Sequence, residues 1–228
     1  MRKAHWRCSS NHPTWIFDLD NTLHEAEITT FPAIDDRMNR YIKSKLNLSE
    51  QLSNQLRQHF WKKYGATLVG LMVEYGIEGS EFLRATHRLE DFSEKIFRSK
   101  SLNTLLRRLN GQKIIASNGP IHYVNDVLRL LGVRELVSNF YGIESYKFEP
   151  KPSRRAFSFL VQKNRLSPTK CIFVDDNLAN LKRAKSLGMR TVWVHSDFRR
   201  PKWVDFRVPS IKKLFSLVVI DGRLKNSV

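Results

Sequence analysis

Residues Thr14-Trp-Ile-Phe-Asp-Leu-Asp20 combine a run of apolar side chains with two carboxyl groups at its end. A second stretch with the same pattern is Lys170-Cys-Ile-Phe-Val-Asp-Asp176. Continuous apolar runs of this length, rich in aromatic and β-branched residues, are typical of strands covered on both faces of a parallel sheet. We therefore predict that each stretch forms a buried strand that ends in acidic side chains.

Outward from these two runs, predicted strands alternate with predicted helices. Apolar runs predict further strands at residues 113–117, 190–195 and 136–141. Apolar residues at helical spacing predict helices at residues 122–131 and 178–187, each followed by a glycine suited to end it. Alternation of this kind indicates βαβ units and an open parallel sheet.

Residues 27–100 interrupt this alternation. They contain no convincing strand, and helical periodicity recurs at residues 38–46, 52–64, 68–75 and 92–97. A helical block that follows the first strand favours an inserted cap. We therefore predict an α/β fold with a Rossmann-like open parallel sheet core, formed by residues 1–26 and 101–228, and an inserted all-helical cap domain at residues 27–100.

Composition excludes several classes of protein. The chain has 228 residues, of which 41% are hydrophobic and 27% charged, as in globular proteins. No apolar run approaches the roughly 20 residues that span a bilayer. The N-terminus lacks the apolar segment of a secretory signal, and Cys8 and Cys171 are too few for a disulfide framework. We expect a cytoplasmic protein without a membrane partner.

The chain is strongly basic, with 39 Lys and Arg against 22 Asp and Glu, a formal net charge of +17. Most of the surplus lies in residues 101–228, which hold 24 basic and 9 acidic residues. Such a surplus attracts anions, including small phosphorylated molecules and nucleic acid. A solvated basic surface explains the charge equally well, so nucleic acid stays only an alternative partner.

Polar residues gather where the predicted strands end, and ligands of open α/β sheets bind beyond the carboxyl ends of the strands. These residues are Asp18, Asp20, Ser117, Asn118, Asp175 and Asp176, joined by Lys151 in a Lys-Pro step. Carboxylates bind Mg²⁺, an ammonium group neutralises developing charge, and a carboxylate can attack phosphorus. The set therefore suits phosphoryl transfer.

The polar residues at the predicted strand ends resemble the motifs of a known family. Asp18-Leu-Asp-Asn-Thr22 resembles the first motif of the haloacid dehalogenase-like phosphatases. Ser117-Asn118 resembles their second motif, Lys151 the third and Asp175-Asp176 the fourth, in the expected order. The interval between the first two motifs leaves room for a helical cap.

The resemblance implies a role for each motif residue. Asp18 would be the nucleophile that forms an aspartyl-phosphate, and Asp20 the general acid and base. Mg²⁺ would be held by Asp18, the backbone carbonyl of Asp20, and Asp176, with Asp175 binding directly or through water. The remaining implied roles are phosphoryl contacts by Ser117 and Lys151 and supporting contacts by Thr22 and Asn118. A carboxyl group at residue 20 points to a phosphatase or phosphomutase.

Residues 61–76, Trp-Lys-Lys-Tyr-Gly-Ala-Thr-Leu-Val-Gly-Leu-Met-Val-Glu-Tyr-Gly, resemble the cap segment of pyrimidine 5′-nucleotidases. This likeness implies a Mg²⁺-dependent nucleoside 5′-monophosphatase acting on substrates such as UMP or CMP. Candidate substrate contacts in the cap are Tyr64, Thr67, Met72 and His87, although the helical spacing of Met72 favours a place in the cap core. The alternatives are a phosphatase of phosphoglycolate or a sugar phosphate, a phosphomutase, and a basic nucleic-acid-binding protein on the same fold.

Other singled-out residues have ordinary structural interpretations. His24 and His122 follow motif segments; a position facing the cleft between cap and core is one interpretation, and an exposed loop position is the more ordinary one, which we expect. Trp193 and Cys171 lie in predicted strands, where they are expected to pack in the core. Asn177 precedes a predicted helix and is a candidate cap for it.

Overall fold

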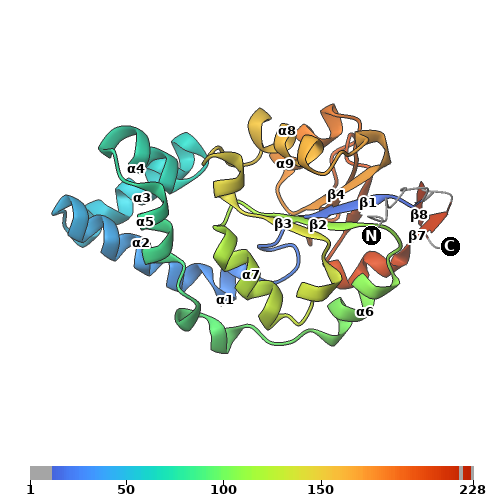
Figure 1. Ribbon diagram of the computed structural model, residues 1–228, viewed down its shortest axis with the longest axis horizontal. Coiled ribbons are helices and arrows are strands. Elements are labelled where there is room, and N and C mark those ends of the chain that lie inside the picture. The colour runs from blue at the N-terminus through green and yellow to red at the C-terminus, as the bar shows by residue number, and fades with distance from the viewer. Residues whose placement is uncertain (1–11, 221–222, 227–228) are drawn as a thin grey trace, which may run out of the picture.

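A computed structural model of the chain describes residues 12–220 and 223–226. Its centre is a six-stranded sheet in the order β3-β2-β1-β4-β5-β6, and every neighbouring pair is parallel (Figure 1). The strands are β1 (Thr14–Phe17), β2 (Lys113–Ala116), β3 (Asn139–Tyr141), β4 (Cys171–Asp175), β5 (Arg190–Val194) and β6 (Phe206–Val208). The α/β class with an open parallel sheet is confirmed.

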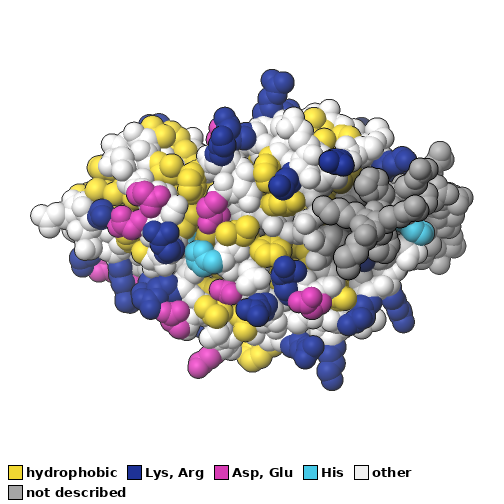
Figure 2. Space-filling view, viewed as in Figure 1, with side chains coloured by type: hydrophobic (Ala, Val, Ile, Leu, Met, Phe, Trp, Pro, Cys, Tyr) yellow, Lys and Arg dark blue, Asp and Glu magenta, His cyan; other side chains and the backbone are white. Residues whose placement is uncertain are grey.

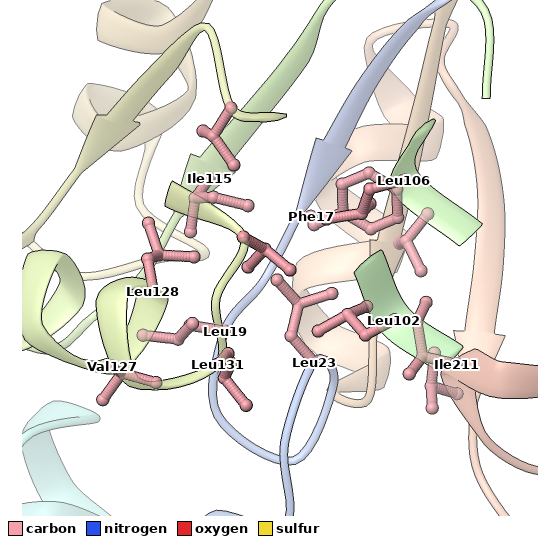
Figure 3. Packing of buried hydrophobic residues seen from close by; sticks show 14 of the residues in the cluster. Phe17, Leu19, Leu23, Leu102, Leu106, Ile115, Val127, Leu128, Leu131 and Ile211 are labelled. Carbon is pink, nitrogen blue, oxygen red and sulfur yellow. The ribbon is translucent and has the colours of Figure 1, made fainter. Parts of the chain in front are cut away.

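Helices cover both faces of the sheet (Figure 1). Helices α6 (Lys100–Arg108) and α7 (Ile121–Leu130) lie on one face, and α8 (Arg154–Lys163) and α9 (Leu178–Ser186) lie on the other. Side chains of β1 alternate between the two cores, because Phe17 belongs to the cluster under α6 and α7 whereas Ile16 belongs to the opposite one. Figure 3 shows Phe17 and Ile115 of the sheet against Leu102, Leu106, Val127 and Leu128 of these helices.

The helices between β1 and α6 form a separate packed group. After the short α1 (Ala26–Thr29) come α2 (Phe31–Leu46), α3 (Glu50–Tyr64), α4 (Thr67–Tyr75) and α5 (Gly79–Thr86). Helices α2 to α5 stand together at one end of the sheet (Figure 1). Their shared core includes Ile42, Phe60, Leu71 and Phe82. Three of these helices were expected, and the all-helical cap is confirmed.

The cap helices end where the sequence provides stop signals. The hydroxyl of Ser49 accepts the Leu52 N–H and so caps the start of α3. Gly65 ends α3 at a φ of 78°, in the left-handed region that favours glycine. A short turn then reverses the chain so that α4 packs against α3.

Some predicted elements differ from the structure. Residues 92–97 do not form an α-helix but contain only the 3-10 turn Ser93–Lys95. Phe92 and Ile96 are nevertheless buried, in the cluster that also holds Phe17 of the sheet. The apolar spacing there reflects burial against the sheet core and not a helix. The boundaries between core and cap at residues 26/27 and 100/101 remain our proposal.

Two strand pairs were not predicted. Strand β6 has three residues, of which only Val208 is buried, so it leaves little apolar pattern. A hairpin of β7 (Leu217–Ile220) and β8 (Arg223–Asn226) follows the turn Ile211–Ser216. Among the described residues, no helix combines the length and apolar character needed to cross a bilayer.

Candidate active site

The carboxyl ends of three neighbouring strands carry the motif residues. Asp18 directly follows β1, Ser117 directly follows β2, and Asp175 is the last residue of β4. Strand β1 pairs with both β2 and β4, and the Asp18 N–H donates to Val174 O at 2.9 Å. Because these strands are parallel, their carboxyl ends meet at one edge of the sheet, as the sequence predicted.

Lys151 reaches this edge from the loop before α8. Its ammonium group donates to Asp18 Oδ1 at 2.7 Å and to Asp175 Oδ2 at 3.0 Å, and its side chain is almost completely buried. Asn118 fixes the backbone of Lys151 on both sides, donating from Nδ2 to Lys151 O (3.0 Å) and accepting the Lys151 N–H at Oδ1 (2.7 Å). Asn118 therefore positions Lys151.

Three carboxyl groups converge beside this lysine. Single oxygens of Asp18, Asp175 and Asp176 all lie within 4.8 Å of one another. Burial raises the pKa of Asp18 to about 7, against the lowering effect of Lys151, and Asp176 adds to the rise. Burial and the charge of Asp175 likewise raise the pKa of Asp176 to about 7. Buried, mutually repelling carboxylates are a donor set that fits a divalent cation.

The two adjacent aspartates have different surroundings. The Asp175 carboxylate accepts the Asn177 N–H at 2.7 Å, and the Asn180 amide donates to both of its oxygens. Asp176 is less enclosed, and its carboxylate accepts a 3.4 Å hydrogen bond from Thr22. Because Asp175 already has donors on both oxygens, Asp176 is the better available ligand for a cation.

Asp20 points into a separate cluster of donors. Its Oδ1 accepts from the Tyr123 hydroxyl at 2.5 Å and lies 3.1 Å from His24 Nε2, and its Oδ2 accepts from Ser117 at 3.4 Å. Burial opposes ionisation, but hydrogen bonds from His24 and Tyr123 hold the pKa of Asp20 below its ordinary value. These donors therefore fix the orientation of the Asp20 carboxyl group.

Comparison with known proteins matches this arrangement to a family. A model of haloacid dehalogenase-like hydrolases matches residues 13–188, which contain all four motifs. The chain belongs to the haloacid dehalogenase-like hydrolases. This confirms the superfamily resemblance, whereas the narrower likeness to pyrimidine nucleotidases remains a prediction.

Individual members resemble this hydrolase distantly. Phosphate metabolism protein 8 of Saccharomyces cerevisiae is 21% identical over 192 residues, 77% of this chain and 59% of the yeast protein. Phosphoglycolate phosphatase of Vibrio vulnificus is 26% identical over 113 residues, 47% of this chain and 49% of the bacterial protein. These alignments thus span about half to three fifths of each relative's length.

Solved structures share the fold. A HAD phosphatase from Thermococcus onnurineus superposes with a TM-score of 0.64 at 18% identity, over 89% of this chain and 95% of that chain. The HAD-hydrolase YfnB from Bacillus subtilis, described as bound to magnesium, gives 0.59 at 20% identity, over 90% and 97% of the two chains. Both identities are low, so the likeness establishes the fold.

The sequence did not reveal the partners that this haloacid dehalogenase-like hydrolase places around Asp20. Tyr123 lies on α7, and its oxygen also lies 2.9 Å from the Thr30 hydroxyl at the start of the cap. A Cβ on Gly119 would lie 2.9 Å from the Tyr123 ring, so a side chain at residue 119 would displace this ring. The glycine that follows the second motif was the sequence feature that could have indicated this contact.

His24 corrects an expectation. An exposed loop position was predicted, but its side chain is 5% exposed and bonds to Asp20. His122 is half-buried, and its Nε2 lies 3.0 Å from the His87 carbonyl oxygen. Both histidines lie beside a motif segment, where the chain turns back and encloses them.

Three of the four cap candidates have partners within the cap, whereas His87 lies near Asp20. The Tyr64 hydroxyl donates to Glu74 at 2.7 Å, and the Thr67 hydroxyl donates to Arg57 O at 3.1 Å. Met72 packs at the border of the cap core. His87 is buried with its ring against Tyr123, at 5.5 Å between ring centroids. Within the described residues, no hydrogen bond joins these four to the motif side chains, so their substrate contacts remain predictions.

Proposed function

We propose that the chain is a Mg²⁺-dependent phosphomonoester hydrolase that works through an aspartyl-phosphate on Asp18. The observation that carries the proposal is the position of the Lys151 ammonium group, 2.7 Å from Asp18 Oδ1 and 3.0 Å from Asp175 Oδ2, beside Asp176. A fixed cation next to a carboxylate at the mouth of the sheet suits attack on a phosphoryl group.

The proposed reaction has two displacements. An Asp18 carboxylate oxygen forms a bond to phosphorus while the ester P–O bond breaks, and Asp20, which enters this step protonated, gives its proton to the departing alcohol oxygen. Water then attacks phosphorus of the aspartyl-phosphate, Asp20 takes its proton, and inorganic phosphate leaves. Lys151 and Ser117 are the proposed contacts to the phosphoryl oxygens, and Thr22 holds Asp176.

The proposed metal ligands are side-chain oxygens of Asp18 and Asp176 and the backbone carbonyl of Asp20. Asp175 then acts through Lys151, which donates to its Oδ2, and Asn180, which donates to both of its oxygens. Bound Mg²⁺ would neutralise charge on the phosphoryl oxygens. The convergence of three carboxyl groups, two of them buried and bonded to the Lys151 ammonium group, supports this assignment.

The proposed substrate is a small phosphorylated metabolite, specifically a pyrimidine nucleoside 5′-monophosphate. Support comes from the likeness of residues 61–76 to pyrimidine nucleotidase caps, with Tyr64 and Thr67 as proposed contacts. A second candidate is phosphoglycolate, because a relative named phosphoglycolate phosphatase shares 26% identity over 113 residues. Cytoplasmic location likewise remains a proposal.

Phosphate release from a panel of esters tests the chemistry and the substrate together. The panel contains UMP, CMP, dTMP, AMP, GMP, phosphoglycolate and hexose phosphates, each with Mg²⁺ and with EDTA. Asp18→Asn keeps the size of the side chain and removes the nucleophile, and we expect no turnover. Removal of Mg²⁺ should abolish turnover reversibly.

The outcomes separate the parts of the proposal. Preference for pyrimidine monophosphates would support the substrate assignment, whereas turnover of phosphoglycolate alone would favour the second candidate. Full activity in EDTA would contradict the metal site. Turnover by Asp18→Asn at the wild-type rate would contradict the aspartyl-phosphate.

A further inference from the structure

The segment after β5 exposes basic and aromatic side chains at the open edge of the sheet. Residues 195–205, here called the edge loop, leave the carboxyl end of β5 and lead to β6, the edge strand. Arg199, Arg200 and Lys202 are exposed, and the Phe198 side chain is 88% exposed. The exposed Phe198 ring thus lies in the same short segment as three exposed basic side chains.

Contacts hold the aromatic groups of this surface in place. The Arg207 guanidinium lies 5.2 Å from the Phe198 ring centroid and donates to His195 O at 3.0 Å. The His195 ring stacks on Trp193, with centroids 4.4 Å apart and an interplanar angle of 8°. An aromatic face beside a fixed cation is the pairing that receives a base and its phosphate.

The edge loop starts next to the candidate active site. Strand β5 pairs with β4 so that Trp193 is the register partner of Asp175. The Trp193 indole N–H donates to the Asp176 backbone oxygen at 2.8 Å. A chain bound along the loop would therefore begin at the same edge of the sheet as the acidic cluster.

Basic side chains outnumber acidic ones on this surface, although the Arg200 guanidinium also donates to Val204 O. In the part of the chain that the structure describes, Arg199, Lys202 and Arg207 form no ion pair with an acidic side chain. Asp205 is paired with Lys185 at 2.5 Å, and Asp197 accepts the Arg199 N–H at 3.0 Å.

The basic side chains elsewhere have a different distribution. On the face shown in Figure 2, Lys and Arg mostly stand singly, with acidic groups among them. At the edge loop, one cation, Arg207 of the neighbouring strand β6, lies against the exposed Phe198 ring.

We propose that the edge loop binds single-stranded nucleic acid, with a base stacked on Phe198 and phosphates contacted by Arg199, Arg200 and Lys202. A single strand fits better than a duplex, since only unpaired bases offer a free face to an aromatic side chain. This site is additional to the proposed phosphatase chemistry and does not require it.

Fluorescence anisotropy with a labelled oligothymidine of about 12 nucleotides, a length within the known range of such sites, tests the proposal. The oligonucleotide carries no terminal phosphate, so turnover cannot affect the signal. We expect binding by the full chain at about 50 mM salt that weakens as salt rises. Phe198→Ala should weaken binding about fivefold or more, the loss expected from one base stack.

A charge-matched pair of triple variants separates the loop from the overall charge. The triple variant R199A/R200A/K202A should reduce the slope of log affinity against log salt by about 2, since each single-strand phosphate contact contributes about 0.7. The control K43A/K45A/K62A removes equal charge from α2 and α3 and should retain most of the binding.

Three results would contradict the proposal. One is absence of binding by the wild-type chain at low salt, and another is an equal loss in the loop and control variants. A duplex bound more tightly than the single strand would also contradict the stacking role of Phe198. Hydrolysis of a small phosphate ester by Phe198→Ala should stay at the wild-type rate, so failure of this proposal is distinguishable from failure of the phosphatase proposal.

Discussion

The ammonium group of Lys151 lies between two buried carboxyl groups, and its own side chain is shielded from water. Although burial disfavours its charge, the neighbouring Asp175 and Asp18 hold the pKa of Lys151 above its ordinary value. Lys151→Met should therefore lower kcat about 10²- to 10³-fold, the usual loss when a preorganised cation is removed. It should also lower the free energy of unfolding by about 3–5 kcal/mol, because two carboxyl groups lose their partner.

Steady-state phosphate release and urea unfolding measure these two effects. Lys170→Met, at an exposed position, is the control and should match the wild-type protein in both. A kcat for Lys151→Met within about tenfold of wild type would argue against contact between Lys151 and the phosphoryl group.

Tyr123 fixes Asp20 through one short hydrogen bond, and Gly119 leaves the space for its ring. Tyr123→Phe removes the donor and should lower kcat by about tenfold, as expected for a misplaced acid and base. Gly119→Ala should act in the same direction by displacing the ring. Tyr141→Phe is the control. It removes a hydroxyl group that donates to Asn164 Oδ1, and it should leave kcat unchanged.

Rates of phosphate release for these three variants, with unfolding curves beside them, distinguish positioning from folding. A loss in Tyr123→Phe that Tyr141→Phe matches would mean that the effect is structural. Wild-type kcat in both Tyr123→Phe and Gly119→Ala would show that Asp20 needs no such support.

At the scale of elements, the likeness of residues 61–76 to nucleotidase caps has a packing explanation. Gly65 ends α3, and the Thr67 hydroxyl bonds to Arg57 O of α3. Gly70 faces Phe60 so closely that a Cβ would lie 2.2 Å from the Phe60 ring. The sequence pattern of residues 61–76 therefore reflects the packing of α4 on α3. It is weaker evidence for the identity of the substrate.

Gly70→Ala should consequently destabilise the cap. Overpacking costs about 1–3 kcal/mol, of which the better helix propensity of alanine returns up to about 1 kcal/mol. Urea unfolding should show a net loss in the free energy of unfolding for Gly70→Ala. The same substitution should cost less in a Phe60→Leu background, because the smaller side chain leaves room for the added methyl group. A Gly70→Ala protein at least as stable as wild type would contradict the close approach of the two helices.

Sequence patterns predicted the elements whose burial is continuous. Strands β1 and β4 were found because each is a run of buried residues, whereas β6 has a single buried residue and was missed. The motif carboxylates were found because they end such strands. The contact between Tyr123 and Asp20 joins residues 103 positions apart and leaves no periodic trace, so only the three-dimensional structure reveals it.

For the whole molecule, cap and core meet at His87. The residue follows α5, its carbonyl oxygen lies 3.0 Å from His122 Nε2 of α7, and its ring contacts Tyr123 of the same helix. Burial lowers the pKa of His87 to about 3, with the nearby His122 adding to the fall. A neutral His87 is thus part of the joint between the two regions.

The stability of the whole chain should therefore decline in acid because of this residue. With an ordinary pKa near 6.5 when unfolded and about 3 when folded, His87 binds a proton in the unfolded chain first. Its contribution to the free energy of unfolding is present above pH ~6.5 and is lost as the pH falls toward ~3, by about 2 kcal/mol between pH ~7.5 and ~5. His87→Asn cannot titrate, so the difference in unfolding free energy between wild type and variant should shrink by that amount. Urea unfolding of both proteins across this range measures the change. A difference independent of pH would mean that His87 is accessible to protons in the folded chain, and that the joint between cap and core is open to water.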